Sequence, residues 1–146
     1  MNPSEVIIEQ VSFDDARAAI EPIRRRVFIE EQHVPEELEW DGLDESATHL
    51  LARIGQQPVA TARLLDNGHI GRMAVLPDWR CQGIGMAMLK QLLSIAQRRR
   101  LPAVFLNAQV SAVPFYRKAG FEIEGESFMD AGIPHKRMVL QLNVID

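Results

Sequence analysis

The sequence predicts a mixed α/β fold built on a mostly antiparallel sheet. Three strand-like segments follow one another with only short turns between them, which is typical of an antiparallel meander. Beyond the meander the apolar spacing changes to a helical period. The predicted order of elements over the whole chain is β, α, β, β, β, α, β, α, β, β. The 146 residues, 47% hydrophobic and 25% charged, have the size and composition of one globular domain, so we expect a single domain over residues 1–146.

The first predicted strand covers residues 5–11, where apolar residues alternate weakly. Ser12 is expected to cap the following helix, because Asp14 and Asp15 would then lie near the positive end of the helix dipole. Pro22 falls inside this helix, which predicts a kink or two segments. The predicted apolar face consists of Ala16, Ala19, Ile20, Ile23, Val27 and Phe28.

Residues 27–52 contain no Lys or Arg but eight acidic residues, and we expect a loop or a short irregular helix at their start. Clustered carboxylates raise the local concentration of a cation, so this stretch would steer an amine substrate. The alternative is a solvated acidic loop. The acidic residues are Glu30, Glu31, Glu36, Glu37, Glu39, Asp41, Asp44 and Glu45.

The meander consists of strands expected at residues 48–54, 59–65 and 69–75. The segment 55–58 indicates a turn, and Asp66-Asn67-Gly68 is a strong hairpin signal. The elements expected after the meander are a helix from residue 84 to Arg98–Arg100, a strand at 103–106, a helix at 113–118 ended by Gly120, and strands at 121–128 and 137–142.

Charge and cysteine content exclude several classes of protein. Sixteen Lys and Arg against twenty Asp and Glu give a net charge of −4, which argues against a nucleic-acid or anionic-membrane binder. There is no apolar run of membrane-spanning length and no signal-peptide pattern at the start, so we expect a cytoplasmic protein. Cys81 alone cannot form an intramolecular disulfide, and four scattered histidines predict no metal site.

The most informative segment is the glycine-containing loop between residue 75 and the helix at residue 84. Gly83 and Gly85 allow backbone amides to approach an anion closely, and the helix N-terminus adds partial positive charge. This chemistry suits a pyrophosphate. A nucleotide triphosphate loop needs Gly-Lys-Ser/Thr, but Met86 follows Gly85. A dinucleotide loop needs a third Gly or Ala where Met88 stands.

Three sets of residues resemble the GNAT acetyltransferase superfamily. The motif Arg80-x-x-Gly83-x-Gly85 resembles its Arg/Gln-x-x-Gly-x-Gly/Ala pyrophosphate loop. Leu106-Asn107-Ala108-Gln109 and the segment 113–121, with its Phe-Tyr-x-x-x-Gly-Phe pattern, look like its fifth strand and the helix after it. The segments 24–35 and 128–135 resemble a small bacterial branch, the YjcF/ElaA-like acetyltransferases. Without this likeness, the loop could be a glycine-rich helix entry that binds nothing.

The resemblance implies a single-domain GNAT fold, a twisted sheet flanked by helices, in which two central strands splay apart and hold acetyl-CoA as co-substrate. The pantetheine arm would pair with the backbone of the fourth strand, the loop amides would hold the pyrophosphate, and Arg80 would be available for a phosphate. The implied acetyl-CoA-binding residues are Met73, Ala74, Val75, Arg80, Cys81, Gln82, Gly83, Ile84, Gly85, Met86 and Asn107.

The resemblance also places Tyr116 at the general-acid position, although a tyrosine on a short helix is commonly a core residue. Many family members carry a glutamate where this chain has Gly71, so a carboxylate base is missing there. His33 and His69 are expected in loops and receive no role. The candidate bases or substrate contacts are His49, His135 and Glu31.

Arg24 occupies a position that resembles one in acyl-homoserine-lactone synthases, which share the GNAT core, and Trp40 and Asp41-x-x-Asp44 add to that likeness. This makes Arg24 a candidate substrate-binding residue. The alternative is a solvated helix face, Arg24–Arg26, in which one arginine pairs with nearby acids. The chain is short for a typical synthase of that kind.

The leading expectation is an acetyl-CoA-dependent N-acetyltransferase that transfers the acetyl group directly to a primary amine of a small molecule. A second interpretation is a catalytically weak acyl-CoA-binding module with the same fold, which the glycine at position 71 favours. An acyl-homoserine-lactone-type synthase is the third. Exposed strands are compatible with a homodimer.

Overall fold

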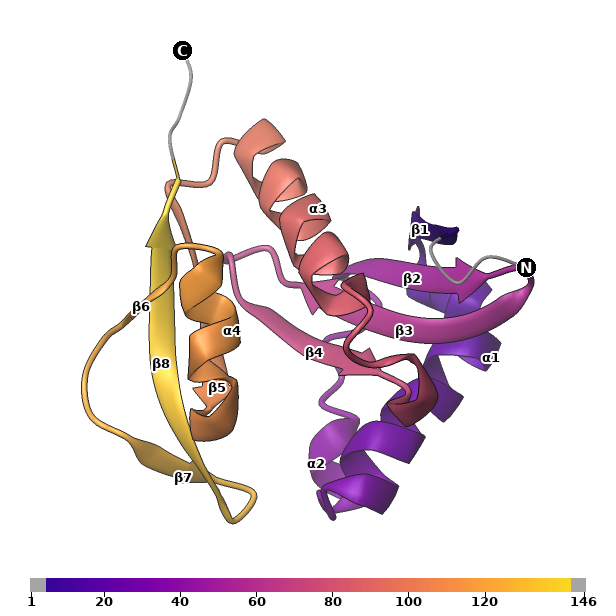
Figure 1. Cartoon of the computed structure of the whole chain (residues 1–146), viewed down its shortest axis with the longest axis horizontal. Coiled ribbons are helices and arrows are strands. Elements are labelled where there is room, and N and C mark those ends of the chain that lie inside the picture. The colour runs from indigo at the N-terminus through magenta and orange to yellow at the C-terminus, as the bar shows by residue number, and fades with distance from the viewer. Residues whose placement is uncertain (1–4, 143–146) are drawn as a thin grey trace.

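In a computed structural model, residues 5–142 form two antiparallel sheets that meet along one short line (Figure 1). The first sheet has the order β1 (Val6–Val11), β2 (Thr48–Ile54), β3 (Gln57–Leu64) and β4 (Ile70–Val75). The second has β8 (Ile133–Gln141) at its centre, paired with β5 (Ala103–Gln109), β6 (Glu122–Ile123) and β7 (Phe128–Asp130). The helices are α1 (Phe13–Arg24), a π-helix (Arg25–Glu31), α2 (Glu36–Glu39), α3 (Ile84–Arg98) and α4 (Val113–Lys118), with 3₁₀ turns at Pro77–Trp79 and Val110–Ala112.

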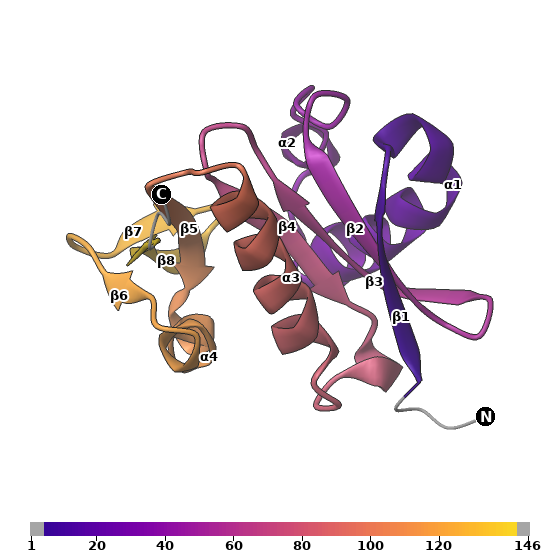
Figure 2. The same ribbon diagram turned by 90° about the horizontal axis from the view of Figure 1, so that it is seen from above.

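Helices cover the first sheet on both faces (Figure 2). Met88 and Leu92 of α3 pack on one face, and Ile20 of α1 packs on the other, where it meets Leu51. Strand β2 therefore buries side chains on both sides, and all of its residues except Arg53 are buried. The predicted meander and the helical face of α3 are confirmed.

The first helix begins as the sequence predicts, with the Asp15 amide donating a 3.2 Å hydrogen bond to the Ser12 hydroxyl. The helix continues through Pro22 and then changes to π-type hydrogen bonding at Arg25. The expectation of two segments is thus met. A π-segment is a local widening of the helix that is often found at functional sites.

Strands β4 and β5 are adjacent but do not pair along their length. Their contact is one parallel bridge between His69 and Phe105, with the Phe105 amide donating to the Gly68 carbonyl at 3.0 Å. A bulge in β4 sets two residues, Arg72 and Met73, opposite one residue of β3, and Arg72 has a φ of +47°. A bulge turns a strand and ends its regular pairing, so the two strands separate beyond the bridge.

The end of the chain departs from the prediction of one strand at residues 121–128. The chain pairs with β8 at Glu122–Ile123 and then turns at Gly125, which has a φ of +84°. It pairs with β8 a second time as the separate strand β7. Strand β8 begins at Ile133, four residues before the predicted start at 137, because the β7–β8 turn is short. Both turn residues, Ala131 and Gly132, have positive φ, as a two-residue hairpin turn requires. Within residues 5–142, no helix is long and apolar enough to span a bilayer.

Candidate active site

A cleft of about 330 Å³ opens where β4 and β5 separate. Its walls come from β4, β5, α4 and the β7–β8 hairpin on one side, and from the segment between the π-helix and α2 on the other. Among its lining residues are Gln32, Leu38, Glu39, His69, Gly71, Arg72, Met73, Asn107, Gln109, Tyr116, Asp130 and His135. The cleft brings together Met73, Asn107, Tyr116 and His135 from the residues predicted for the site.

Tyr116 enters the cleft from α4. Its ring lies edge-on to Phe115, with the ring centres 5.0 Å apart, and to Phe121 at 6.0 Å. Burial raises the pKa of the Tyr116 hydroxyl to about 12. The hydroxyl therefore keeps its proton at neutral pH.

The glycine loop lies at the end of β4. Gly83 has a φ of +84° directly before α3, and a side chain there would meet no atom within 4 Å. Within the described residues, the amides of residues 81–86 donate to no backbone carbonyl. Gly85 lies against the Phe115 ring, 3.4 Å from the point a Cβ would take. Free amides at a helix N-terminus are an arrangement that suits a phosphate-type anion.

The backbone of β4 also offers hydrogen-bonding groups to the cleft. The Leu76 amide donates to the Val59 carbonyl of β3 at 2.9 Å. Because the backbone groups of successive strand residues point to opposite edges, those of Val75 point away from β3, toward the gap.

Arg80 is already engaged, unlike the free phosphate ligand that the sequence predicts. Its guanidinium makes two 2.7 Å hydrogen bonds to the Glu31 carboxylate, and its Nε donates to the Val75 carbonyl at 2.9 Å. The hydrogen bonds from Arg80 lower the pKa of Glu31. Glu31 does not line the cleft and is held as a carboxylate, which makes it a weak candidate base. Arg80 fastens the loop to the π-helix.

The predicted bases His49 and His135 differ in their access to the cleft. His49 is 1% exposed and donates from Nε2 to the Asp44 carbonyl at 2.8 Å, away from the cleft. Burial lowers its pKa, so it is a neutral core residue. His135 lines the cleft, and its Nδ1 donates to the Ile133 carbonyl at 2.7 Å, which leaves Nε2 as the acceptor of the neutral ring.

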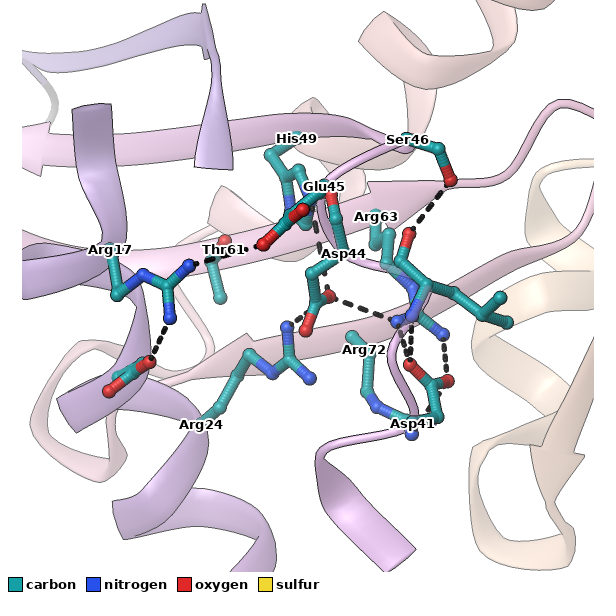
Figure 3. Close-up of polar contacts among 12 residues, drawn as sticks. Arg17, Arg24, Asp41, Asp44, Glu45, Ser46, His49, Thr61, Arg63 and Arg72 are labelled. Atoms are coloured by element: carbon teal, nitrogen blue, oxygen red, sulfur yellow. Dashed lines mark hydrogen bonds and ion pairs between the residues drawn. The ribbon is translucent and has the colours of Figure 1, made fainter. Parts of the chain in front are cut away.

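Behind the cleft, three arginines and three carboxylates form a network in which Arg24, Glu39, Asp44 and Arg63 are buried. Figure 3 shows five of its members, Arg24, Arg63, Arg72, Asp41 and Asp44. The Arg24 side chain is fully buried and contacts Glu39 and Asp44, each at 2.7 Å. Arg63 bonds to Asp41 at 2.8 Å and to Asp44 at 3.0 Å. Burial opposes ionisation of Asp41, but the hydrogen bonds from Arg63 and the Leu43 amide outweigh it and lower the Asp41 pKa to about 2.

Arg72 joins this network to the cleft wall. From the β4 bulge it donates to the Glu39 carbonyl at 3.0 Å and lies 3.2 Å from the Glu39 carboxylate. Burial raises the pKa of Glu39 although the charges of Arg72 and Arg24 oppose the shift. Arg72 therefore holds α2 in place as one wall of the cleft.

Arg24 does not line the cleft, which corrects its expected role as a substrate contact. Its hydrogen-bond partners are the network acids and the Glu39 carbonyl. The acidic stretch is not a free anionic entrance, although all of its acids except Glu39 and Asp44 are exposed. Six of its eight carboxylates pair with arginines from elsewhere in the chain: Glu31 with Arg80, Glu36 with Arg25, Glu39 with Arg24 and Arg72, Asp41 with Arg63 and Arg72, Asp44 with Arg24 and Arg63, and Glu45 with Arg17.

Residues 8–142 match the family model described as "Acetyltransferase (GNAT) domain". The chain belongs to the GNAT acetyltransferase family. It is 39% identical over 121 residues to the uncharacterized N-acetyltransferase YjcF of Bacillus subtilis, covering 80% of this chain and 86% of that protein.

Two solved structures share this GNAT fold. An acyl-CoA N-acyltransferase from Pseudomonas aeruginosa has a TM-score of 0.83 at 31% identity, with 92% of this chain and 99% of that chain covered. ElaA from Escherichia coli has a TM-score of 0.83 at 26% identity, with 91% and 98% covered. These relatives place the chain in the YjcF/ElaA-like branch of the GNAT family, as an acyltransferase.

Sequence reasoning missed several residues of this GNAT cleft. Gln32 and Gln109 join across its mouth, with the Gln109 amide donating to the Gln32 carbonyl oxygen at 2.8 Å. Glu39 lines the wall, and His69 lies at its inner end. Nothing in the sequence pairs Gln32 with Gln109, but the position of His69 at the start of a predicted strand is a usable signal. Within residues 5–142, no cluster of three or more potential metal ligands is present.

Proposed function

We propose that this chain is an acetyl-CoA-dependent N-acetyltransferase that transfers the acetyl group directly to a primary amine of a small molecule. The observation that carries the proposal is the continuity of the site. Free amides at residues 81–86 lead along the open edge of β4 to a cleft in which Tyr116 lies. Gly85 connects the two parts, since it packs between Phe115 and Val75.

The residues present fit acetyl-CoA. The amides at the start of α3 would bind the pyrophosphate, and Gly83 leaves the space above them open. The Val75 amide and the backbone groups of Met73 would pair with the pantetheine amides, with Asn107 on the opposite wall, while the Val75 carbonyl stays with Arg80. A backbone N–H of β4 would polarise the thioester carbonyl. In this proposal Arg80 keeps Glu31 and holds the loop in the shape that receives the phosphates.

Tyr116 would act on the leaving group. When the amine nitrogen attacks the thioester carbon, the carbon–sulfur bond breaks and its electron pair goes to sulfur. The Tyr116 hydroxyl, protonated and buried beside the reaction site, would then give its proton to the thiolate.

The acceptor side of the cleft supports a small amine. The cleft is too small for a folded partner, and its wall at α2 is held by the arginine network. Among the described residues, two acids line the cleft, Glu39 and Asp130. The Glu39 carboxylate pairs with Arg24 and Arg72, so Asp130, which is exposed in β7, is the better candidate to hold an ammonium group.

A cytoplasmic location, one domain over residues 1–146 and a homodimer stay predictions.

This function is tested by measuring the release of CoA from acetyl-CoA with a panel of primary amines. Wild type is compared with Tyr116→Phe. We expect turnover of at least one amine, and in the mutant a loss of kcat of about a hundredfold or more, the usual contribution of a general acid. Acetyl-CoA affinity should change by less than about twofold, because the lost hydroxyl acts in the transition state. Tight acetyl-CoA binding without turnover of any amine would contradict the enzyme and favour the acyl-CoA-binding module.

A further inference from the structure

The cleft lacks the carboxylate that many GNAT members carry at the position of Gly71. Glu31 is bound to Arg80, and His49 is buried outside the cleft. A primary amine is protonated at neutral pH, so direct attack on acetyl-CoA requires a group that removes a proton from it. The chain must supply that group from elsewhere in the cleft.

His69 lies next to the position from which a side chain at residue 71 would extend. A Cβ added to Gly71 would have the His69 Nε2 as its nearest neighbour, 4.0 Å away. The His69 backbone is held by its parallel bridge to Phe105, and its imidazole stacks on the Phe105 ring, with centres 4.7 Å apart and planes within 18°. It is therefore fixed at the fork of β4 and β5, in the lining of the same cleft as Tyr116.

The surroundings of His69 keep its ring neutral. Burial lowers its pKa, and the positive charges of Arg63, Arg72 and Arg137 lower it further, while Asp41 opposes them. Its ring makes no hydrogen bond with any other described residue. His135, in contrast, uses Nδ1 to bond its own hairpin. A neutral, fixed and unbonded imidazole in a cleft is suited to accept a proton.

We propose that His69 is the general base of this enzyme, an inference that rests on the proposed acetyl transfer. His69 takes one proton from the bound ammonium group and becomes imidazolium. The freed lone pair forms the bond to the thioester carbon, the carbon–sulfur bond breaks, and sulfur takes the Tyr116 proton. The second amine proton returns to the Tyr116 oxygen through solvent. His69 releases its proton to solvent, so the net products are the amide, CoA and one proton.

The test compares the pH dependence of kcat/KM in wild type and His69→Gln, with His33→Gln as control because His33 is exposed and outside the cleft. We expect a wild-type acid limb below the ordinary histidine pKa, and in His69→Gln a loss of kcat of about a hundredfold together with loss of that limb. His33→Gln and His135→Gln should keep the limb. If His135→Gln removes the limb instead, His69 is not the base.

A carboxylate restored at position 71 gives a second, independent test. Gly71 does not have positive φ and has room for a side chain. In a His69→Ala background, adding Gly71→Glu should raise kcat at least about tenfold above that of His69→Ala alone, whereas adding Gly71→Gln should not raise it. Equal rates for the two double variants would contradict the proposal.

A measurement on wild type covers the case in which His69 variants fail to fold. The His69 imidazole, followed by NMR, should titrate with the pKa found for the kinetic acid limb; a mismatch overturns the assignment. If wild type turns over amines and His69→Gln keeps its rate and acid limb, only His69 is wrong. If wild type turns over no amine, the proposed function itself fails.

Discussion

Arg24, Arg25 and Arg26 are consecutive in the sequence, yet the fold gives each a different environment. Arg24 is fully buried between Glu39 and Asp44. Arg25 is half-exposed and pairs with Glu36 at 2.7 Å, while Arg26 is exposed. A buried charge that loses its partner remains in a poorly solvated place, so only the first of the three should matter greatly for stability.

Replacing Arg24 with Met should therefore lower the free energy of unfolding by about 3–5 kcal/mol, because Glu39 and Asp44 would each lose a buried cation. Arg26→Met, the control at the exposed end of the same run of arginines, should change it by less than about 0.5 kcal/mol. Urea denaturation of the two variants measures both values. A change below about 1 kcal/mol for Arg24→Met would show that the network does not depend on this residue.

Cys81 gives a chemical probe of the loop, since it is the single cysteine and is exposed. Its rate of alkylation by N-ethylmaleimide, followed by intact mass, should fall about tenfold at an acetyl-CoA concentration ten times its Kd. Urea-unfolded chain is the control and should show no protection. An unchanged rate at saturation would place acetyl-CoA away from this loop.

At the scale of elements, the loop before α3 depends on the conformation of one glycine. Gly83→Ala would place a methyl group over the free amides and should weaken acetyl-CoA binding about tenfold or more. Gly42 is a matched control, because it has a φ of +79°, close to that of Gly83, and a Cβ added there would also meet no atom within 4 Å. Gly42→Ala should show similar backbone strain with unchanged acetyl-CoA affinity in calorimetry. Equal losses of affinity would mean that strain, not the anion site, explains the effect.

The elements that the sequence predicts well are those with long, regular periodicity. Strand β2 and the apolar face of α3 are as expected, because a helix or strand that packs on a core repeats its pattern locally. The sequence does not separate strands β6 and β7, since the positive φ of Gly125 leaves little trace in an apolar pattern. Pro22 predicts a break in the first helix, but no local signal predicts that the segment from Arg25 is a π-helix.

The site is predictable from sequence only where a local motif carries the chemistry. The glycine loop and the Phe115-Tyr116 pair lie in short motifs. Tyr116 lines the cleft, and Phe115 lies against Gly85 of the loop. The pairing of Asp41 in the acidic stretch is not predictable from sequence, because its partners Arg63 and Arg72 are distant in sequence. His69 gains its place only when the β4–β5 fork brings it against Phe105.

For the whole molecule, the network makes stability depend on pH in acid. The folded pKa of Asp41 is about 2, below its ordinary value of 3.8. Its contribution is therefore complete above about pH 4 and is lost as pH falls toward 2, because the unfolded chain binds the proton first. Between pH 5 and pH 3, unfolding free energies from urea titration should fall less steeply in Asp41→Asn than in wild type. Asp14→Asn, at an exposed surface pair with Arg17, should keep the wild-type slope; an equal slope in Asp41→Asn would contradict the assignment.

Calorimetric titration of the whole chain with acetyl-CoA, at two temperatures, is the most direct test that the β4–β5 cleft and its loop form a binding site. We expect one site per chain, with a Kd in the range of about 1 μM to 1 mM that is common for enzyme substrates. The heat of binding should become more negative on warming, since the cleft buries apolar surface. Absence of binding at both temperatures would contradict the enzyme and the binding module alike.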